Sequence, residues 1–373
     1  MKHGLFILLA LSLRLAVGPS ANAATTTGVT TPTVPSSITP AVLASEVAGF
    51  TTIHIAPAQT QPEKAQLSLD GVGLVNHIAY EGTTKKAQGR TLFDSAATWS
   101  DNQFNPTPGT KSPPSHYLEI TSGPAAGLMV DIVATHAKHQ TLTLAAPLPA
   151  NIGKNADYCV RPHWTLAGLF GTTNEAGLQT GDANDADLIS IYAGKAYDHY
   201  YFSTVSQGTN SQDSAIGSGW RRIGGGSVDQ ANTPIYPDDG LVITRMVDTP
   251  LDIMVAGVVK LDRAMIPIRR GLNVVANVYQ APITLAASRL YTGHPGNGLR
   301  AGGNADSADQ VQIYNGTGYD TYYYQMSGRN GSGWRSATDA KTDAGNTALA
   351  VGSAFIVRRD GPAFNWIPPV PVP

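Results

Sequence analysis

Two short acidic clusters contain the residues whose types and spacing best suit chemistry. The stretch "GDANDAD" holds Asp182, Asn184 and Asp187, and "GGNADSAD" holds Asn304, Asp306 and Asp309 at the same aligned places. Side-chain oxygens on a glycine-containing loop are ligands that Ca²⁺ prefers, although the spacing departs from the EF-hand loop and a calcium site usually needs more than three ligands. Asp and Asn also start turns by bonding to their own backbone. The favoured interpretation is a turn, and calcium binding is the alternative hypothesis.

The histidines invite a metal hypothesis, chiefly through His136, His139 and His163. Zinc sites take histidine, cysteine or acidic ligands at defined spacings. The stretch "ATHAKHQT" lies between two strand-like runs, which is typical of a polar hairpin connection, and no further ligand at a suitable spacing supports it. The sequence predicts no zinc site here.

Catalytic constellations are weak. Cys159 and His163 are four residues apart in "DYCVRPHW", but a single cysteine in a strand-like run is more often a buried apolar residue. No serine occupies a nucleophile elbow. Glu119 and Asp131 lie on strand-like runs and glycoside cleavage uses two carboxyl groups, yet sequence alone does not select such a pair. We expect no enzyme, with a secreted polysaccharide hydrolase as the alternative.

The tyrosines fall in two similar stretches that predict β-hairpins. "ADLISIYAGKAYDHYYF" (186–202) matches "ADQVQIYNGTGYDTYYY" (308–324) without a gap. Asn-Gly suits a tight hairpin turn, which places Tyr314 opposite Tyr319 and Gln310 opposite Tyr323. Strand alternation then puts polar and aromatic side chains together on one face of each hairpin. The candidate ligand-binding residues are Tyr192, Tyr197, His199 and Tyr201 in the first hairpin and Tyr314, Tyr319 and Tyr323 in the second.

Two interpretations of this polar-aromatic face remain open. Tyrosine offers apolar area together with a hydroxyl group, so the face suits stacking on sugar rings or contact with a protein partner. Alternatively, the face packs against a second sheet of the same module or against the neighbouring copy.

Further matches extend the repeat beyond the hairpins. "GSGWRR" at Gly217 recurs as "GSGWRS" at Gly331, and "DGLVITR" (239–245) parallels "GSAFIVR" (352–358). Self-similarity at a fixed offset is the signature of a repeated unit. The C-terminal part is therefore predicted to contain two copies of one β module.

Composition favours an exported all-β protein. Lys2 and His3 precede the apolar run "GLFILLALSL", and "SANA" precedes Ala24, which is typical of a signal peptide cleaved after Ala23. Only 14% of the residues are charged and the formal net charge is -2, so the chain lacks the electrostatic basis for binding nucleic acid or anionic lipid. No later run is apolar for long enough to span a membrane as a helix. With one cysteine, Cys159, no intramolecular disulfide can form.

The expected organisation has five parts. Residues 1–23 form the signal peptide and 24–46 a linker rich in Thr and Pro. Evenly spaced short β-rich runs predict a small sandwich or barrel over 47–163. Two sandwich-like β modules follow over 164–262 and 263–373, the second with a proline-rich tail.

The chain also resembles an uncharacterised family of exported bacterial proteins. The resemblance rests on "AGFTTIHIA", "YLEITSGPAAG", "RPHWTLAGLFG", the two "Y..YYY…GW" hairpins and the terminal "FIVRRDG" with its proline-rich end. It runs from about Val47 to the C-terminus and implies no particular activity. We expect a non-catalytic structural, assembly or binding protein of the periplasm, cell surface or exterior. Its expected partners are other surface proteins or an extracellular polysaccharide.

Overall fold

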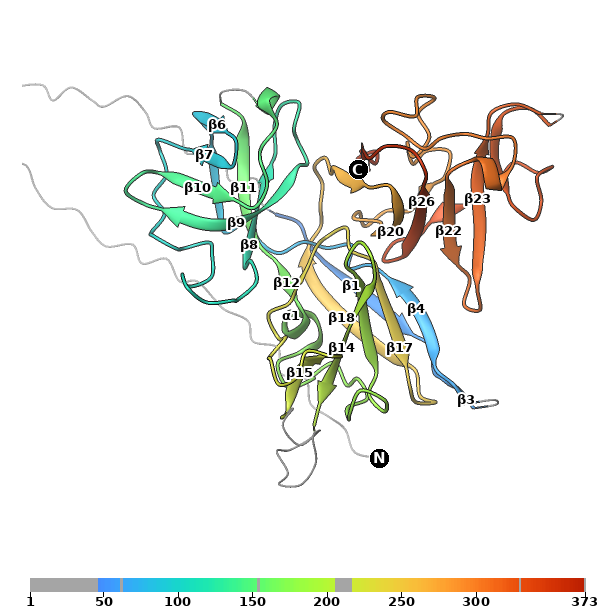
Figure 1. Ribbon diagram of the computed structural model, residues 1–373, viewed down its shortest axis with the longest axis horizontal. Coiled ribbons are helices and arrows are strands. Elements are labelled where there is room, and N and C mark those ends of the chain that lie inside the picture. Colours follow the sequence, from blue (N-terminus) through green and yellow to red (C-terminus); the bar gives the residue numbers. More distant parts are fainter. Residues whose placement is uncertain (1–45, 61–62, 153–154, 205–216, 329, 372–373) are drawn as a thin grey trace, which may run out of the picture. The chain divides into compact units, whose positions relative to one another are not determined.

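The computed structural model describes residues 46–60, 63–152, 155–204, 217–328 and 330–371. The predicted signal peptide and nearly all of the predicted linker lie outside these residues. The described chain is almost entirely β, with one α-helix, α1 (Leu166–Phe170), among these residues, so the all-β prediction is confirmed (Figure 1). No described helix is long and apolar enough to cross a membrane.

A seven-stranded antiparallel sheet occupies residues 80–162, in the order β5-β11-β8-β9-β10-β7-β6. Only residues 84 and 85 separate the two end strands, β5 and β6, so the sheet closes on itself as a small barrel. Its interior is apolar and includes Leu118, Ile132 and Val160. The strands are β5 (Tyr80–Thr83), β6 (Lys86–Gln88), β7 (Thr91–Phe93), β8 (His116–Ile120), β9 (Met129–His136), β10 (Thr141–Leu144) and β11 (Asp157–Pro162). A 3-10 turn, η1 (Ala150–Ile152), precedes β11.

Sheet 1 has five antiparallel strands in the order β15-β14-β13-β17-β4. These are β4 (Gln66–Asp70), β13 (Leu188–Tyr192), β14 (Tyr197–Ser203), β15 (Gly219–Arg222) and β17 (Leu241–Arg245). Ribbon 1 pairs β1 (Ala48–Ile55) with β18 (Leu251–Val258). The short strands β12 (Trp164–Thr165) and β16 (Pro234–Ile235) form a further pair. A core containing Ile53, Trp220, Ile243 and Val255 joins sheet 1 to ribbon 1. A short hairpin of β2 (Gln59–Thr60) and β3 (Glu63–Lys64) lies between β1 and β4.

Sheet 2 has the corresponding order β24-β23-β22-β26-β20. Its strands are β20 (Gly271–Ala276), β22 (Gln310–Tyr314), β23 (Tyr319–Gln325), β24 (Gly333–Ser336) and β26 (Ala354–Arg359). Ribbon 2 pairs β19 (Ile266–Ile268) with β27 (Phe364–Trp366), and β21 (Ile283–Thr284) pairs with β25 (Ala348–Leu349). The matching hairpins thus occupy the same positions in the two sheets, but the predicted alignment of β17 with β26 is wrong by one residue. Ile189 pairs with Ile243 and the equivalent Val311 pairs with Val357, so residues 239–245 correspond to 353–359 and not to 352–358. A separate core contains Ile266, Val311, Trp334 and Trp366.

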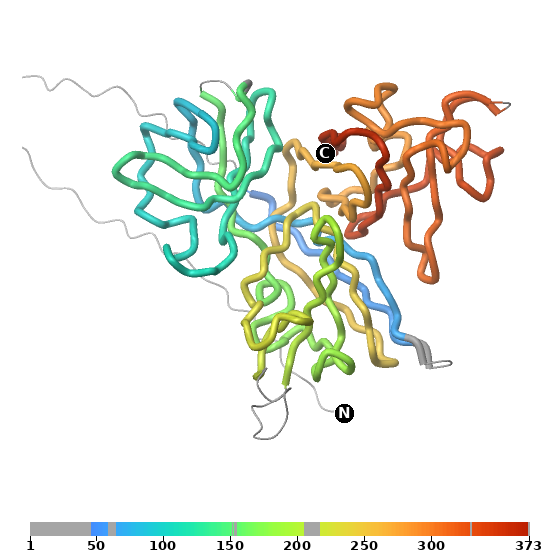
Figure 2. The backbone as a smooth tube through the Cα atoms, viewed as in Figure 1, coloured from blue at the N-terminus to red at the C-terminus, as the bar shows by residue number. Residues whose placement is uncertain are grey.

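The strand pairings do not match the predicted N-terminal unit of residues 47–163. Strands β1 and β4 do not join the barrel that follows them in sequence; β1 pairs with β18 and β4 pairs with β17. Figure 2 shows the blue N-terminal strands running beside the yellow segment near residue 250. We refer to sheet 1 with ribbon 1 as module 1, and to sheet 2 with ribbon 2 as module 2. The barrel is therefore inserted between β4 and β12, within the sequence range of module 1. Sequence periodicity identified the strands but carried no information on which distant strand would pair with them.

Sheets 1 and 2 also meet each other, through reciprocal contacts. The Gly71 amide donates to the Gly352 carbonyl at 3.0 Å, and the Ala276 amide donates to the Asp238 carbonyl at 2.9 Å. Gly71 directly follows the edge strand β4, and Ala276 ends the corresponding edge strand β20. Between the sheets lies an apolar cluster, whose buried members are Leu69, Val274, Ala276, Ala354 and Ile356. Equivalent segments thus contact each other in the manner of a two-fold interface within one chain.

Asp70, at the end of β4, makes this interface sensitive to pH. Its backbone bridges to Ser353, and its Oδ2 is buried with no hydrogen-bond partner among the described residues. Burial raises the pKa of the Asp70 carboxyl from 3.8 to about 6, because the charged form is disfavoured away from water. Folded Asp70 therefore holds its proton more strongly than unfolded Asp70, so its contribution to stability is present below about pH 4 and is lost as the pH rises through 6.

We expect Asp70→Asn to stabilise the protein at pH 8 by about 1–3 kcal/mol, since the amide is never charged. At pH 4 the variant and the parent should have nearly equal free energies of unfolding. Urea unfolding at the two pH values measures the difference. A variant with the same advantage, or none, at both values would contradict this explanation.

Candidate functional site

The hairpin register is the one predicted from the sequence. Tyr314 pairs with Tyr319 and Gln310 with Tyr323, and in the first hairpin Tyr192 pairs with Tyr197. Of the two interpretations of this face, packing rather than exposure holds at its centre, because Tyr201 is 3% exposed and Tyr323 is 2% exposed. Neither ring can stack on a sugar in this structure.

The remaining tyrosines of the face mostly serve packing between the sheets. Tyr192, Tyr197 and Tyr314 are half-buried against the apolar cluster between sheets 1 and 2. Burial, together with Tyr319 and Tyr192, raises the pKa of Tyr197 to about 12. Tyr319 is 43% exposed. His199 is half-buried and its Nδ1 lies 2.7 Å from the Ser190 hydroxyl. The apolar cluster between the two sheets therefore covers the end of this face that carries Tyr192, Tyr197 and Tyr314.

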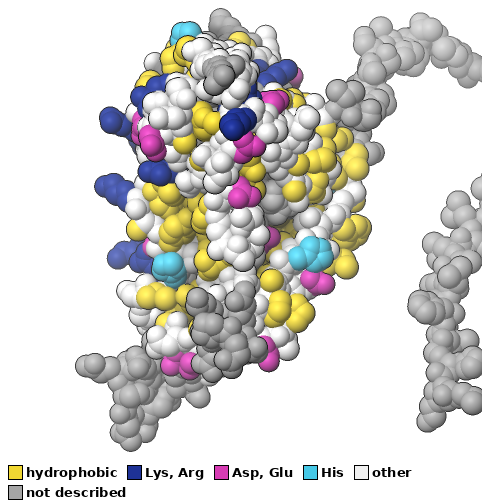
Figure 3. Space-filling model, turned by 90° about the vertical axis from the view of Figure 1, so that its right-hand side faces the viewer, with side chains coloured by type: hydrophobic (Ala, Val, Ile, Leu, Met, Phe, Trp, Pro, Cys, Tyr) yellow, Lys and Arg dark blue, Asp and Glu magenta, His cyan; other side chains and the backbone are white. Residues whose placement is uncertain are grey.

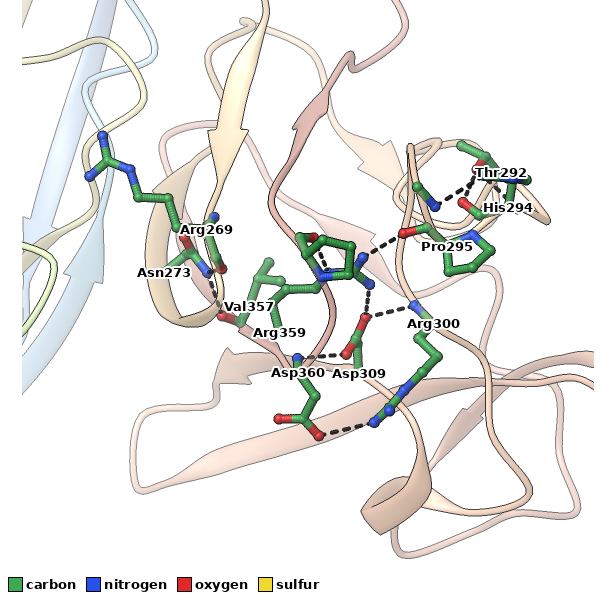
Figure 4. Close-up of polar contacts among 12 residues, drawn as sticks. Arg269, Asn273, Thr292, His294, Pro295, Arg300, Asp309, Val357, Arg359 and Asp360 are labelled. Atoms are coloured by element: carbon green, nitrogen blue, oxygen red, sulfur yellow. Dashed lines mark hydrogen bonds and ion pairs between the residues drawn. The ribbon is translucent and has the colours of Figure 1, made fainter.

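Asp309 and Asp187, which were calcium-ligand candidates, are buried partners of arginine. Asp309 pairs with Arg359, and both side chains are fully buried. The same carboxylate accepts from the backbone amides of Arg300 at 2.6 Å and Asp360 at 2.9 Å (Figure 4). A carboxylate with three hydrogen-bond donors, one of them an arginine, does not need a metal ion to balance its charge.

The first module repeats this network. Asp187 pairs with Arg245 and accepts from the amides of Gln179 and Met246, each at 2.8 Å. Two aligned acids with the same kinds of donor are therefore structural groups of the module.

The other members of the acidic clusters form turns or caps. Asp182 accepts from the Asn184 amide at 2.7 Å, and Asn184 itself is exposed. Asn304 caps the short helix η3 (Ala305–Ser307), which contains the exposed Asp306. Among the described residues, no three His, Cys, Asp or Glu side chains are placed to hold a metal ion. The calcium hypothesis is not supported at Asp187 and Asp309, and the turn interpretation fits the remainder.

Glu119 and Asp131 take different partners. Glu119 is buried and pairs with Lys260, which also contacts Asp262 at 2.6 Å. Arg161 lies 3.6 Å from Glu119 and 2.6 Å from Glu46. Burial raises the pKa of Glu119. For Lys260, burial favours the neutral amine, but the nearby acids outweigh it and raise the pKa. This network ties the barrel to the segments on either side of module 1.

Cys159 is buried beside this network, with its Sγ 3.9 Å from Glu119 Oε2. Burial and the charge of Glu119 raise the pKa of the thiol to about 12, which disfavours the thiolate that a nucleophile needs. His163 pairs with Asp131 rather than with Cys159. The expectation of a buried, apolar-type cysteine is consistent with this position.

A groove of about 740 Å³ lies where β9 of the barrel meets both modules. The turn after β13, the segment after β16 and the segment from β19 to β20 supply its other walls. Its polar and aromatic lining consists of Asp131, Tyr192, Lys195, Tyr236, Asp238, Asp239, Arg269, Arg270, Asn273 and Asn365.

A hydrogen-bonded chain supports one wall of the groove. Asp131 Oδ1 lies 3.1 Å from Nε2 of the buried His163, and the Tyr236 hydroxyl donates to Asp131 Oδ2 at 2.7 Å. Asp239 accepts from the Tyr236 amide at 2.9 Å. Burial raises the pKa of Asp238, and burial together with the charge of Asp238 raises that of Asp239. The groove thus offers carboxyl groups that retain a proton more readily than exposed ones, so they can donate as well as accept.

Sequence reasoning missed Tyr236, Asp238 and Asp239, which all lie in "PIYPDDG". One signal was present: the aligned stretch in the second copy, "ALAVGSA", has none of these side chains. Asp131 was considered, but only as a catalytic partner of Glu119. Asp131 instead contacts His163, directly after β11, and Tyr236, directly after β16. Local sequence patterns do not encode contacts between residues so far apart in the chain.

Comparisons with known proteins identify no relative. No protein-family model matches the chain, and no curated protein or solved structure matches it either.

Proposed function

We propose that this protein is an exported structural or assembly protein that acts without turning over a substrate. Three apolar cores, the reciprocal contacts between sheets 1 and 2, and the buried ion pairs around Glu119 support a building-block role. Such pairs fix relative positions because separating them would leave buried charges without partners.

The outer face of ribbon 1 carries the proposal. Phe50 is 70% exposed and Met254 is 74% exposed, and the two strands pair so that both lie on this face. Figure 3 shows that hydrophobic side chains gather in patches among polar ones on the side of the molecule that it presents. Exposed apolar side chains that lie together favour contact with another protein surface. We propose a second copy of this chain as the partner.

We expect the protein from Ala24 to Pro373 to form concentration-dependent oligomers in sedimentation velocity experiments. Phe50→Ser with Met254→Ser should shift the population to monomers, because the contact loses its apolar area. Val228→Ser is the matched control, since Val228 is 62% exposed but lies away from ribbon 1 in sequence and pairing. A parent that remains monomeric at every concentration, or a double variant that still assembles, would reject this function.

A further inference from the structure

We propose that the groove between the barrel and the two modules is a binding site for an uncharged oligosaccharide. This goes beyond the assembly role, and it replaces the hairpin tyrosines Tyr201 and Tyr323, which are buried, with a different set of groups. The groove's volume of about 740 Å³ falls within the range of small-molecule sites.

The two modules provide an internal comparison that separates structural residues from groove residues. Groups needed for folding recur in both modules, as the Asp187–Arg245 and Asp309–Arg359 pairs do. Four polar groups of the groove do not recur, although Tyr192 recurs as Tyr314. Pairing and sequence align Lys195 with Thr317, Tyr236 with Ala350, Asp238 with Gly352 and Asp239 with Ser353.

This difference is informative because the second module forms the same strand order without those side chains. The fold therefore does not require a carboxyl pair or a lysine at these places. Burying part of two adjacent carboxyl groups costs stability unless they gain a partner, and the raised pKa values of Asp238 and Asp239 reflect that cost. Strained or costly polar groups concentrated in a concave surface are typical of binding sites.

The chemistry of the lining favours a polyhydroxylated ligand without net charge. Three acidic side chains, Asp131, Asp238 and Asp239, line the groove together with three basic ones, Lys195, Arg269 and Arg270, so both acceptors and donors are available to a ligand. Sugar hydroxyls donate to carboxylates and accept from guanidinium groups, and the lining offers both kinds of partner. Figure 4 shows the Arg269 guanidinium extending away from Asn273, which bonds to the Arg269 backbone rather than to that group.

Aromatic and apolar groups complete the match. Tyr192 and Tyr236 both line the groove and are half-buried, so each offers part of a ring beside polar groups. Met129, Met265 and Leu272 supply apolar surface in the same groove. The C–H faces of sugar rings can pack on such surface while their hydroxyls bond to the charged rim.

The test is calorimetric titration of the protein from Ala24 to Pro373 with neutral oligosaccharides from cellulose, xylan, mannan and chitin, after a glycan array has ranked them. Asp239→Ser and Lys195→Thr install the residues that the second module carries at the aligned places, so the fold should tolerate them. We expect Asp239→Ser to weaken binding at least about tenfold, because one hydrogen bond to a charged or strongly polarised group is lost. Thr317→Lys, at the exposed aligned turn, should leave the affinity unchanged.

Three outcomes would overturn the proposal. One is that no neutral oligosaccharide binds the parent. Another is that neither groove variant weakens binding while thermal unfolding shows that both are folded. The last is a preference for acidic oligosaccharides or for peptides over neutral sugars, which would assign the groove to another ligand class. Oligomer formation is measured separately, so failure of the assembly role does not decide this test.

Discussion

Asp309→Asn is expected to lower the free energy of unfolding by about 3–5 kcal/mol. The substitution keeps the shape of the side chain but removes the charge that faces Arg359, whose guanidinium is fully buried. An unpaired buried cation costs far more than the pair itself contributes, because water cannot reach it. Two further bonds, from the Arg300 and Asp360 amides, would also lose their charge-assisted character.

Chemical denaturation of the parent and the variant measures this effect, with Asp306→Asn as the matched control. Asp306 lies in the same acidic cluster but is exposed, so its substitution should change stability by less than about 0.5 kcal/mol. The aligned variant Asp187→Asn should resemble Asp309→Asn, because Arg245 is similarly buried. Equally small effects at Asp306 and Asp309 would mean that the ion pair between Asp309 and Arg359 does not stabilise the fold.

Gly71→Ala is expected to destabilise the contact between sheets 1 and 2 by about 1–3 kcal/mol or more. A methyl group built on Gly71 would overlap the Cβ of Ala276. Ala276 is completely buried, and backbone hydrogen bonds hold both segments in place. The obstacle is steric and lies between the two sheets, since neither side chain can rotate away.

This explanation predicts rescue by exchange. Adding Ala276→Gly to Gly71→Ala moves the methyl group to the other side of the interface, so most of the lost stability should return. Gly303→Ala is the control, because its Cβ would meet no atom within 4 Å. Thermal unfolding of the parent, Gly71→Ala, Ala276→Gly and the double variant gives the coupling energy. A double variant less stable than either single variant would show that the overlap is not the cause.

Local features could be predicted from sequence, and the hairpins show why. The Asn-Gly turn and the alternation of side chains were enough to pair Gln310 with Tyr323 correctly, because turn chemistry sets the register. The all-β class followed from short runs separated by turn residues. The burial of Tyr323 could not be predicted, since it depends on which surfaces cover its face.

The candidate site was predicted only in fragments. Asp131 was noticed as an acid on a strand, but its contact with Tyr236 joins residues from the barrel and from module 1. The clusters around Asp187 and Asp309 drew attention because they were aligned and acidic. That alignment reflected a shared structural role, whereas the unaligned residues Asp238 and Asp239 line the groove.

The insertion of the barrel also fixes an order of events during folding. Strands β1 and β4 leave the ribosome, and enter any export channel, before the barrel does, yet their partners β18 and β17 follow it. The barrel's strands are contiguous in the chain and can pair before the partners of β1 and β4 have been synthesised. Module 1 therefore closes late, through contacts of high sequence separation, which slow folding. A chaperone that binds the unpaired strands β1 and β4 would act on this protein before module 1 has folded.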